Sequence, residues 1–274
     1  MKLGIVAIPR KLADNGEPVL EQLVGIAQNV ENLGFEGLWV TDAFARGWPT
    51  LDPLILLGAL ATATKRIELG TCVVQIPLRH PVEHAHRVQT LHLLAGGRLR
   101  FGVGSGSTKH DFDAVQADYD ARFKTLPAYL EVMRKVWNEE PVYGPAISLW
   151  PGTAGGPPVM LGAWRSQRWI NLAAQHCQGW IASGIHGSLE DLGLGVEMYR
   201  KAGGKRVILA NVFTDFRPDP VVGISSHVPK ISLYCSPAEA KDRLKRIEDL
   251  GVDDVLCVVP GDDPGQLETI RGLI

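Results

Sequence analysis

The chain has 274 residues, of which 45% are apolar and 21% are charged. Its 28 Lys and Arg residues nearly balance its 30 Asp and Glu residues, so the net charge of -2 provides no bulk electrostatic attraction to nucleic acid. Unbroken apolar stretches such as Leu54–Leu57 are far shorter than the ~20 residues that cross a bilayer. We therefore expect a folded protein with neither a nucleic-acid partner nor a membrane segment.

Cysteine usage and the first residues bear on the compartment and the domain organisation. The apolar segment Leu3–Ile8 is not followed by a small-residue cleavage pattern, so we predict no secretory signal and a cytoplasmic location. No repeat or change in composition divides the chain, and we expect residues 1–274 to form one domain. Wide spacing without C-x-x-C favours buried free thiols over disulfides or zinc for the four cysteines, Cys72, Cys177, Cys235 and Cys257.

Short apolar segments alternate with amphipathic ones along the whole chain. The apolar segments are rich in Val, Ile, Leu and Phe without strict alternation, as expected for parallel strands that are covered on both faces. In chain order, the predicted strands are Leu3–Ile8, Gly37–Val40, Ile67–Val74, Leu99–Val103, Val159–Leu161, Gly179–Ala182, Val207–Phe213 and Val255–Val259.

Helical segments lie between these strands. Val19–Leu33 and Leu126–Asn138 carry apolar residues at three- and four-residue steps. Gly34 follows the first helix and Gly251 follows another at Ala238–Leu250, where a left-handed cap suits glycine. Proline stands at three helix starts, at Pro81, Pro237 and Pro264. Eight strands, each followed by a helix, predict an α/β protein with a (β/α)₈ TIM barrel, and a doubly wound open sheet is the alternative.

The predicted helix Leu54–Ala63 differs from the others because it has no charged side chain and its apolar residues point in every direction around the axis. An outer helix of a monomeric barrel should keep a polar face. We therefore predict that a second copy of the chain covers this helix in a homodimer, and the alternative is that a loop of the same chain covers it.

Two local patterns do not match the motifs that they resemble at first sight. The segment Gly102–Gly106 fits neither G-x-G-x-x-G, since Ser107 and Lys109 stand where glycine is needed, nor G-x-S-x-G. Three histidines lie close together without a metal-ligand spacing, so we predict no metal site; they are His80, His84 and His86.

Polar residues follow several predicted strands at the carboxyl end, which is the rim where barrel enzymes place their chemistry. These residues are Thr41, Asp42, Thr71, Gln75, Ser105, Ser107, Trp164, Arg165 and Ser166.

Several segments, in chain order, are similar to those of one known family. Leu38–Asp42 resembles its second strand, Glu68–Val82 its third strand and the loop that follows, and Leu94–Gly106 its fourth strand. Weaker similarities follow in Pro158–Gly162, Gly179–Ile181 and Ser236–Asp253. On these segments the chain resembles the bacterial luciferase-like monooxygenase family over nearly its whole length.

This resemblance implies a barrel that binds FMN, in its reduced form, or the deazaflavin coenzyme F420 at the carboxyl-terminal rim. It also implies a non-proline cis peptide bond at Cys72–Val73, under the ring of the cofactor; an ordinary strand is the alternative. The residues that it implies for cofactor binding on the inner strands are Thr41, Thr71, Cys72, Val73, Gly104 and Ser105.

The cofactor's phosphate is expected where the segment Gly162, Ala163, Trp164, Arg165, Ser166 turns into a helix. Gly162 would let the backbone approach the ligand, Ser166 would cap the helix, and the helix N-terminus offers free N–H groups. Arg165 or Arg168 would add a charge-assisted contact, and the alternative makes both arginines solvated surface residues.

The chain also departs from the family at residues that carry chemistry. Luciferases have a histidine at the position of Asp42 and a cysteine at that of Gly104, so light emission is not expected. Deazaflavin dehydrogenases have a histidine at the position of Ala43 and a glutamate at that of Ser107, so two proton-transfer groups of that branch are absent here. Asp42 is the candidate acid or base, and its alternative role is capping or pairing with a rim arginine such as Arg46.

Three functions follow from the resemblance. The first is a two-component monooxygenase that takes reduced FMN from a separate flavin reductase and oxidises a small organic substrate with O₂. The alternatives are a deazaflavin-dependent reductase or dehydrogenase and a non-catalytic flavin-binding barrel. Gln75 and Ser107 are candidate substrate contacts; Trp48 and Trp164 are candidates for the pocket wall, with core packing as the alternative.

Overall fold

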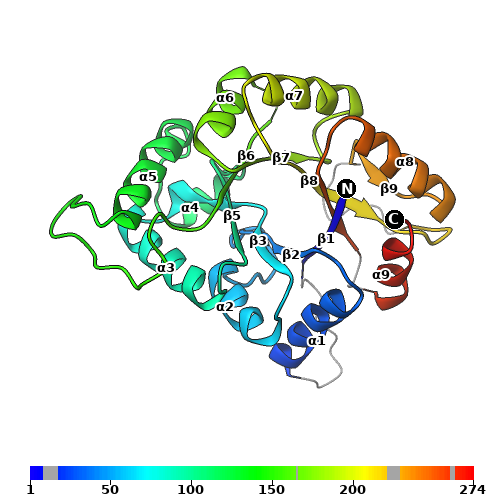
Figure 1. The fold of residues 1–274 in the computed structure, drawn as a ribbon, viewed down its shortest axis with the longest axis horizontal. Helices are drawn as coiled ribbons and strands as arrows, with labels where there is room; N and C mark the ends of the chain where they lie inside the picture. The colour runs from blue at the N-terminus through cyan, green and yellow to red at the C-terminus, as the bar shows by residue number, and fades with distance from the viewer. Residues whose placement is uncertain (9–17, 165, 221–228, 260–262) are drawn as a thin grey trace.

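The computed structural model describes residues 1–8, 18–164, 166–220, 229–259 and 263–274. Within these ranges, eight parallel strands close into a barrel because the last of them pairs with both the first and the seventh (Figure 1). In order around the barrel they are β1 (Lys2–Ala7), β2 (Gly37–Val40), β3 (Glu68–Thr71), β5 (Leu99–Gly104), β6 (Val159–Gly162), β7 (Gly179–Ser183), β8 (Val207–Thr214) and β10 (Asp254–Val258). The predicted (β/α)₈ barrel is confirmed, and the open sheet is wrong.

Helices surround the strands as an outer ring (Figure 1). They are α1 (Val19–Asn32), α2 (Pro53–Ala63), α3 (Pro81–Leu94), α4 (Lys109–Ala114), α5 (Arg122–Trp137), α6 (Gln167–His176), α7 (Leu189–Lys201), α8 (Pro237–Asp249) and α9 (Pro264–Arg271), with a 3₁₀ helix η1 (Ile76–Leu78). Gly34 and Gly251 have φ of +84° and +90° after α1 and α8, as predicted. In the described ranges, no helix combines the length and the apolar character that a membrane crossing requires.

The predicted strands agree with the structure to within one residue, with one exception. The segment predicted as Ile67–Val74 is not continuous: β3 ends at Thr71, and the two-residue strand β4 (Val74–Gln75) pairs with β5 beyond the interruption. The peptide bond between Cys72 and Val73 is cis, as the resemblance implied. The two-residue strand β9 (Ser232–Leu233) pairs with β8 outside the barrel.

Charged side chains fill the amino-terminal end of the barrel. Arg206, just before β8, donates from Nη2 to Glu68 on β3 at 2.7 Å and to Asp254 on β10 at 2.8 Å. Arg100 on β5 adds a second guanidinium 2.9 Å from Glu68. Burial by itself would raise the pKa of Glu68, but the two arginines outweigh it and the pKa is lowered. These four residues form the floor network of the barrel.

The charge-free helix α2 is mostly covered by its own chain. Its buried residues are Pro53, Leu54, Leu56, Leu57, Leu60 and Ala61. Ile55, in contrast, is 74% exposed, and Thr62, two helical turns later on the same face, is exposed as well. The covering layer predicted from the sequence is therefore needed only over the Ile55 face.

We propose that a second copy of the chain covers this face, and sedimentation equilibrium at micromolar concentration tests the proposal. The wild-type chain is expected to sediment as a dimer, because burying Ile55 removes a large apolar side chain from water. The substitution Ile55→Glu is expected to give monomers with an unchanged circular dichroism spectrum. A monomeric wild-type chain contradicts the homodimer.

Candidate functional site

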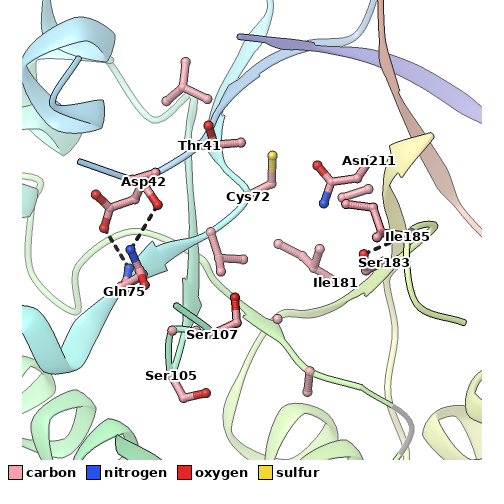
Figure 2. Close-up of a pocket in the computed structure, with 18 of the residues that line it drawn as sticks. Thr41, Asp42, Cys72, Gln75, Ser105, Ser107, Ile181, Ser183, Ile185 and Asn211 are labelled. Carbon is pink, nitrogen blue, oxygen red and sulfur yellow. Dashed lines mark hydrogen bonds between the residues drawn. The ribbon is translucent and has the colours of Figure 1, made fainter. Parts of the chain in front are cut away.

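A cavity of about 740 Å³ lies at the carboxyl-terminal end of the barrel, a size typical of ligand pockets (Figure 2). Most of the residues predicted to form a site line this cavity. They are Thr41, Asp42, Trp48, Cys72, Val73, Gln75, Gly104, Ser105, Ser107, Gly162, Ala163, Trp164 and Ser166.

Two predicted residues are placed differently. Thr71 is fully buried and donates its hydroxyl to the carbonyl oxygen of Gly102 at 2.7 Å, so it ties β3 to β5 and does not line the cavity. Arg165 lies outside the described residues. Arg168, the other arginine considered for the phosphate, packs its guanidinium 5.5 Å from the centre of the Trp169 ring and is absent from the lining.

Val73 and two glycines fit together in the middle of the cavity wall. A Cβ added at Gly104 would lie 2.6 Å from Val73 Cγ2, and one added at Gly162 would lie 2.7 Å from Val73 Cγ1. The sequence suggested that Gly162 gives a ligand access to the backbone. In the structure, Gly162 also leaves room for the side chain of Val73, and because it lines the cavity its role beside a ligand stays a prediction.

The neighbouring Cys72 is buried below the mouth of the cavity. Its desolvation raises the pKa of the thiol to about 12, so the sulfur stays protonated and is a poor nucleophile. Cys72 therefore contributes shape and apolar contact to the cavity wall.

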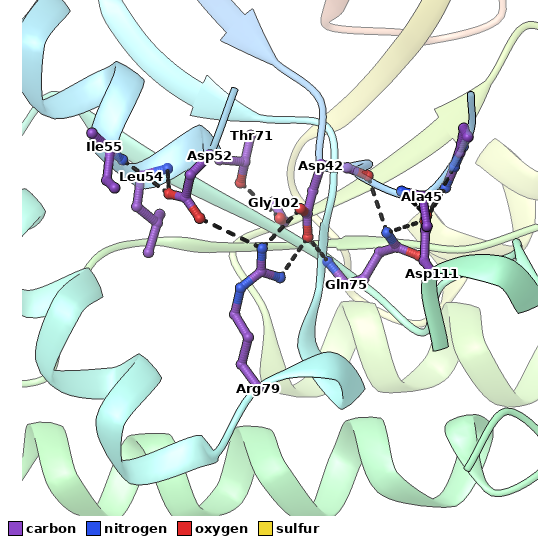
Figure 3. Close-up of polar contacts among 11 residues, drawn as sticks. Asp42, Ala45, Asp52, Leu54, Ile55, Thr71, Gln75, Arg79, Gly102 and Asp111 are labelled. Carbon is purple, nitrogen blue, oxygen red and sulfur yellow. Dashed lines mark hydrogen bonds and ion pairs between the residues drawn. The ribbon is translucent and has the colours of Figure 1, made fainter. Parts of the chain in front are cut away.

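Asp42 is held by ionic and backbone contacts (Figure 3). Arg79 donates from Nη1 to Oδ2 at 2.6 Å and from Nη2 to Oδ1 at 2.8 Å, and the backbone N–H of Gln75 donates to Oδ2 at 2.9 Å. The alternative role, pairing with a rim arginine, is confirmed, although the partner is Arg79 and the arginine given as an example, Arg46, binds Asp111. Asp42 binds Arg79 because the chain folds back after β4 through η1 and brings Arg79 to the rim.

This geometry bears on the candidate acid or base. Burial lowers the pKa of Arg79, but hydrogen bonds with Asp42 outweigh burial and raise it. The guanidinium thus stays charged, and it occupies both oxygens of the Asp42 carboxylate. Asp42 is placed to fix the loop that carries Gln75, rather than to exchange a proton with a ligand.

A buried carboxylate that the sequence did not single out completes this set of contacts. Asp111 on α4 is fully buried and accepts from Arg46 Nη2 at 2.8 Å, from Gln75 Nε2 at 2.8 Å and from the N–H of Ala45 at 3.1 Å (Figure 3). Burial raises its pKa, but the contacts with Arg46, Gln75 and Ala45 outweigh burial and lower it. Asp111 lies on a short helix in a polar stretch, where no pattern marked it.

The amide of Gln75 is consequently fixed on its nitrogen side. Its Nε2 donates to the carbonyl oxygen of Asp42 at 3.1 Å and to Asp111 at 2.8 Å. The Gln75 side chain therefore joins the β2 and α4 sides of the rim, and it shapes the cavity wall as a rigid group.

Arg122, at the start of α5, is a second cavity residue that the sequence did not reveal. Its guanidinium lies 3.6 Å from the ring centre of Tyr119 and 4.2 Å from that of Phe123. Nη1 donates to the carbonyl oxygen of Tyr119 at 2.7 Å, and the buried Nε has no hydrogen-bond partner among the described residues. Arg122 forms no ion pair with a carboxylate of the described residues. The helix was predicted from Leu126 because the first turn is polar.

Aromatic side chains form part of the mouth. Trp164 is 65% exposed, and its ring centre lies 5.0 Å from that of His186, which also lines the cavity. Core packing is therefore wrong for Trp164. Trp48 is half-buried and also lines the cavity.

The clustered histidines do not form a metal site. His84 is buried against the ring of Phe101, with ring centres 5.8 Å apart, and burial together with Arg79 and Arg87 lowers its pKa to about 3. No group of three or more metal-ligating side chains is found in the described ranges of the chain.

A closed parallel barrel with a large cavity at the carboxyl ends of its strands defines a ligand-binding TIM barrel. The chain belongs to the luciferase-like monooxygenase family, whose model matches residues 1–228. Proteins similar to this chain include F420-dependent oxidoreductases, and structures of this fold are known in complex with FMN and with an F420-acetone adduct.

Similar proteins include enzymes of both kinds. Over 171 residues the chain is 31% identical to 4-hydroxyprotoasukamycin monooxygenase of Streptomyces nodosus subsp. asukaensis, covering 58% of this chain and 46% of that protein. Monooxygenase RslO1 of Streptomyces bottropensis has the same fold, with a TM-score of 0.81, 18% identity and coverage of 100% and 97%. The F420-dependent tetrahydromethanopterin reductase of Methanopyrus kandleri also has this fold, with a TM-score of 0.76 and 16% identity. The match covers 100% of this chain and 98% of that one. The chain thus spans less than half of the first relative.

Proposed function

We propose that this protein is the oxygenating component of a two-component monooxygenase, which uses reduced FMN from a separate flavin reductase to oxidise a small organic substrate. The observation that carries the proposal is the cavity at the carboxyl-terminal mouth, in which Arg122 is a cation without a carboxylate partner among the described residues. Membership of the luciferase-like family supports the redox chemistry. When bound, the flavin would supply the reaction with O₂, and the protein would bind and orient it.

The residues of the cavity fit a flavin phosphate and ring. The half-buried side chain of Val73 offers an apolar surface for a flat ring, held in place by Gly104 and Gly162. Arg122 would hold the phosphate, because it belongs to the cavity lining and its Nε has no hydrogen-bond partner among the described residues. The N-terminus of α6, with Ser166 at the cap position, adds free N–H groups at the same mouth, so the phosphate site predicted there stays a proposal.

Two positions in the lining favour FMN over F420. Ala43 and Ser107 border the cavity and provide no strong acid or base, whereas the resemblance implies a histidine and a glutamate there in deazaflavin dehydrogenases. Asp42, which those enzymes share, is bound to Arg79. Hydride transfer to or from an alcohol would lack its proton-transfer groups at these positions.

The test is an anaerobic titration of the purified chain with reduced FMN and, separately, with reduced F420, followed by flavin absorbance. We expect reduced FMN to bind more tightly, and admission of air to consume O₂ faster than free reduced FMN does when a substrate is present. Preference for F420 with turnover that ignores O₂ supports the reductase instead. FMN binding with O₂ consumption at the free-flavin rate, across a broad substrate panel, supports a non-catalytic carrier.

A variant arm of the same titration tests the phosphate contact. Arg122→Met keeps much of the packing on Tyr119 and Phe123 but removes the charge, so it is expected to weaken FMN binding by about 10- to 100-fold. Riboflavin, which has no phosphate, should bind both proteins equally. Arg168→Met, outside the cavity lining, is the matched control and should leave the FMN affinity unchanged. If Arg168→Met weakens FMN binding and Arg122→Met does not, the phosphate contact is made by Arg168 and not by Arg122.

A further inference from the structure

Asn211 has an unusual backbone conformation in the wall of the cavity. It lies inside β8 with φ of +59°, which L-residues other than Asn and Asp rarely adopt. The pairing with β10 shifts here, since Leu209 faces Val255 and Val212 faces Cys257, so that two residues of β8 stand opposite one. Such a bulge redirects a side chain, and it is common beside ligand sites.

The bulge turns the Asn211 amide into the cavity, where it points toward Cys72 from the opposite wall (Figure 2). Its surroundings are mostly apolar: Ile181, Ile185 and Phe213 also line this part of the cavity. The Asn211 amide makes no hydrogen bond to the described part of the chain. An amide that is presented without a partner from an apolar wall points to a ligand that supplies both a donor and an acceptor.

The charged side chains on the facing wall, and one end of the Gln75 amide, are already engaged, whereas Gln75 Oε1 has no hydrogen-bond partner among the described residues. Arg79 holds Asp42, and Asp111 holds both Arg46 and the amide nitrogen of Gln75. Near Asn211 itself, Ser183 Oγ accepts from the N–H of Ile185 at 3.3 Å. Asn211 is thus an available group with both a donor and an acceptor on the β8 side, away from the α5 side where Arg122 lies.

We propose that Asn211 is a cofactor-binding residue that hydrogen-bonds the edge of the cofactor ring where a carbonyl and an imide N–H lie side by side. This inference rests on the proposed flavin site. FMN and F420 both carry such an edge in their pyrimidine ring, and the asparagine amide complements it with one donor and one acceptor. The other end of the FMN ring system is apolar and would leave the Asn211 amide unpaired.

The test combines a variant with a modified ligand. Asn211→Gly removes the amide while glycine tolerates the left-handed backbone, so folding should be preserved. FMN and N3-methyl-FMN, which lacks the imide N–H, are titrated into both proteins and followed by flavin fluorescence. We expect the variant to bind FMN about tenfold more weakly than the wild type. Methylation should weaken wild-type binding by a similar factor and change binding to the variant little.

The control is Gln116→Gly, because Gln116 also has a left-handed backbone, with φ of +56°, but is absent from the cavity lining. It should leave the FMN affinity unchanged. Equal FMN affinity of wild type and Asn211→Gly overturns the inference alone, as does full additivity of variant and methylation, which means that Asn211 does not touch this edge. A wild type that binds neither FMN nor F420 overturns both the flavin site and this inference.

Discussion

Gly102→Ala is expected to destabilise the protein by more than about 3 kcal/mol, the upper end of the usual range for overpacked cores. The added Cβ would lie 1.8 Å from the carbonyl oxygen of Thr71 and 2.9 Å from Ile181 Cδ1. The first of these atoms belongs to the backbone of β3, so no rotamer change relieves the clash. Thermal unfolding followed by calorimetry measures the effect.

The same substitution should also remove flavin binding from any protein that still folds. Thr71 immediately precedes Cys72 and Val73, so moving its carbonyl displaces the apolar surface proposed for the ring. Gly25→Ala is the matched control, because Gly25 lies in α1 with nothing within 4 Å of the added Cβ. It should stabilise the helix by about 0.5–1 kcal/mol. If Gly102→Ala and the wild type have the same melting temperature, β3 is free to shift and the expected clash does not occur.

Arg206→Met is the second substitution with a large expected effect. It leaves Glu68 and Asp254 without their shared guanidinium at the closed end of the barrel, where the side chains of Glu68 and Asp254 are 17% and 5% exposed. Removing one partner of such a pair costs about 3 kcal/mol, which corresponds to a melting temperature lower by roughly 6–12 °C for a chain of this size. Lys201→Met, which breaks an exposed pair with Glu197, should cost less than about 1 kcal/mol.

Acidification should also weaken the floor network and lower the stability of the protein. The pKa of Glu68 is lowered in the folded protein, so its contribution to stability is present above its unfolded pKa and is lost as the pH falls through the folded value. The stability difference between wild type and Arg206→Met should therefore shrink on acidification. A difference that stays constant down to pH 3 would assign the loss to packing of the arginine stem.

The barrel could be predicted from the sequence because its signals are local. The apolar segments have the length and residue types of buried parallel strands, and Gly34 and Gly251 mark helix ends that the structure places at positive φ. The break after Thr71 was not visible in this pattern, since Cys72 and Val73 are as apolar as the strand before them. Only the resemblance indicated the cis bond there.

The candidate site was predictable as a location and less so as a set of contacts. Strand ends identified the rim, because parallel strands place their carboxyl ends together. Partner choice depends on loop paths: Asp42 binds Arg79, whereas Arg46, four residues from Asp42, binds Asp111. Asn211 was hidden inside a predicted strand, because a bulge is set by pairing with β10 and leaves no local mark.

The floor network has a consequence for how ligands enter and leave the barrel. Arg206 bridges Glu68 and Asp254 across the base of the barrel, and the cavity lies at the mouth, so we infer that ligands enter and leave the cavity through the mouth. Whatever lies deepest must arrive first and depart last. Two ligands that share the cavity would therefore exchange in a compulsory order, with the outer one leaving before the inner one is replaced.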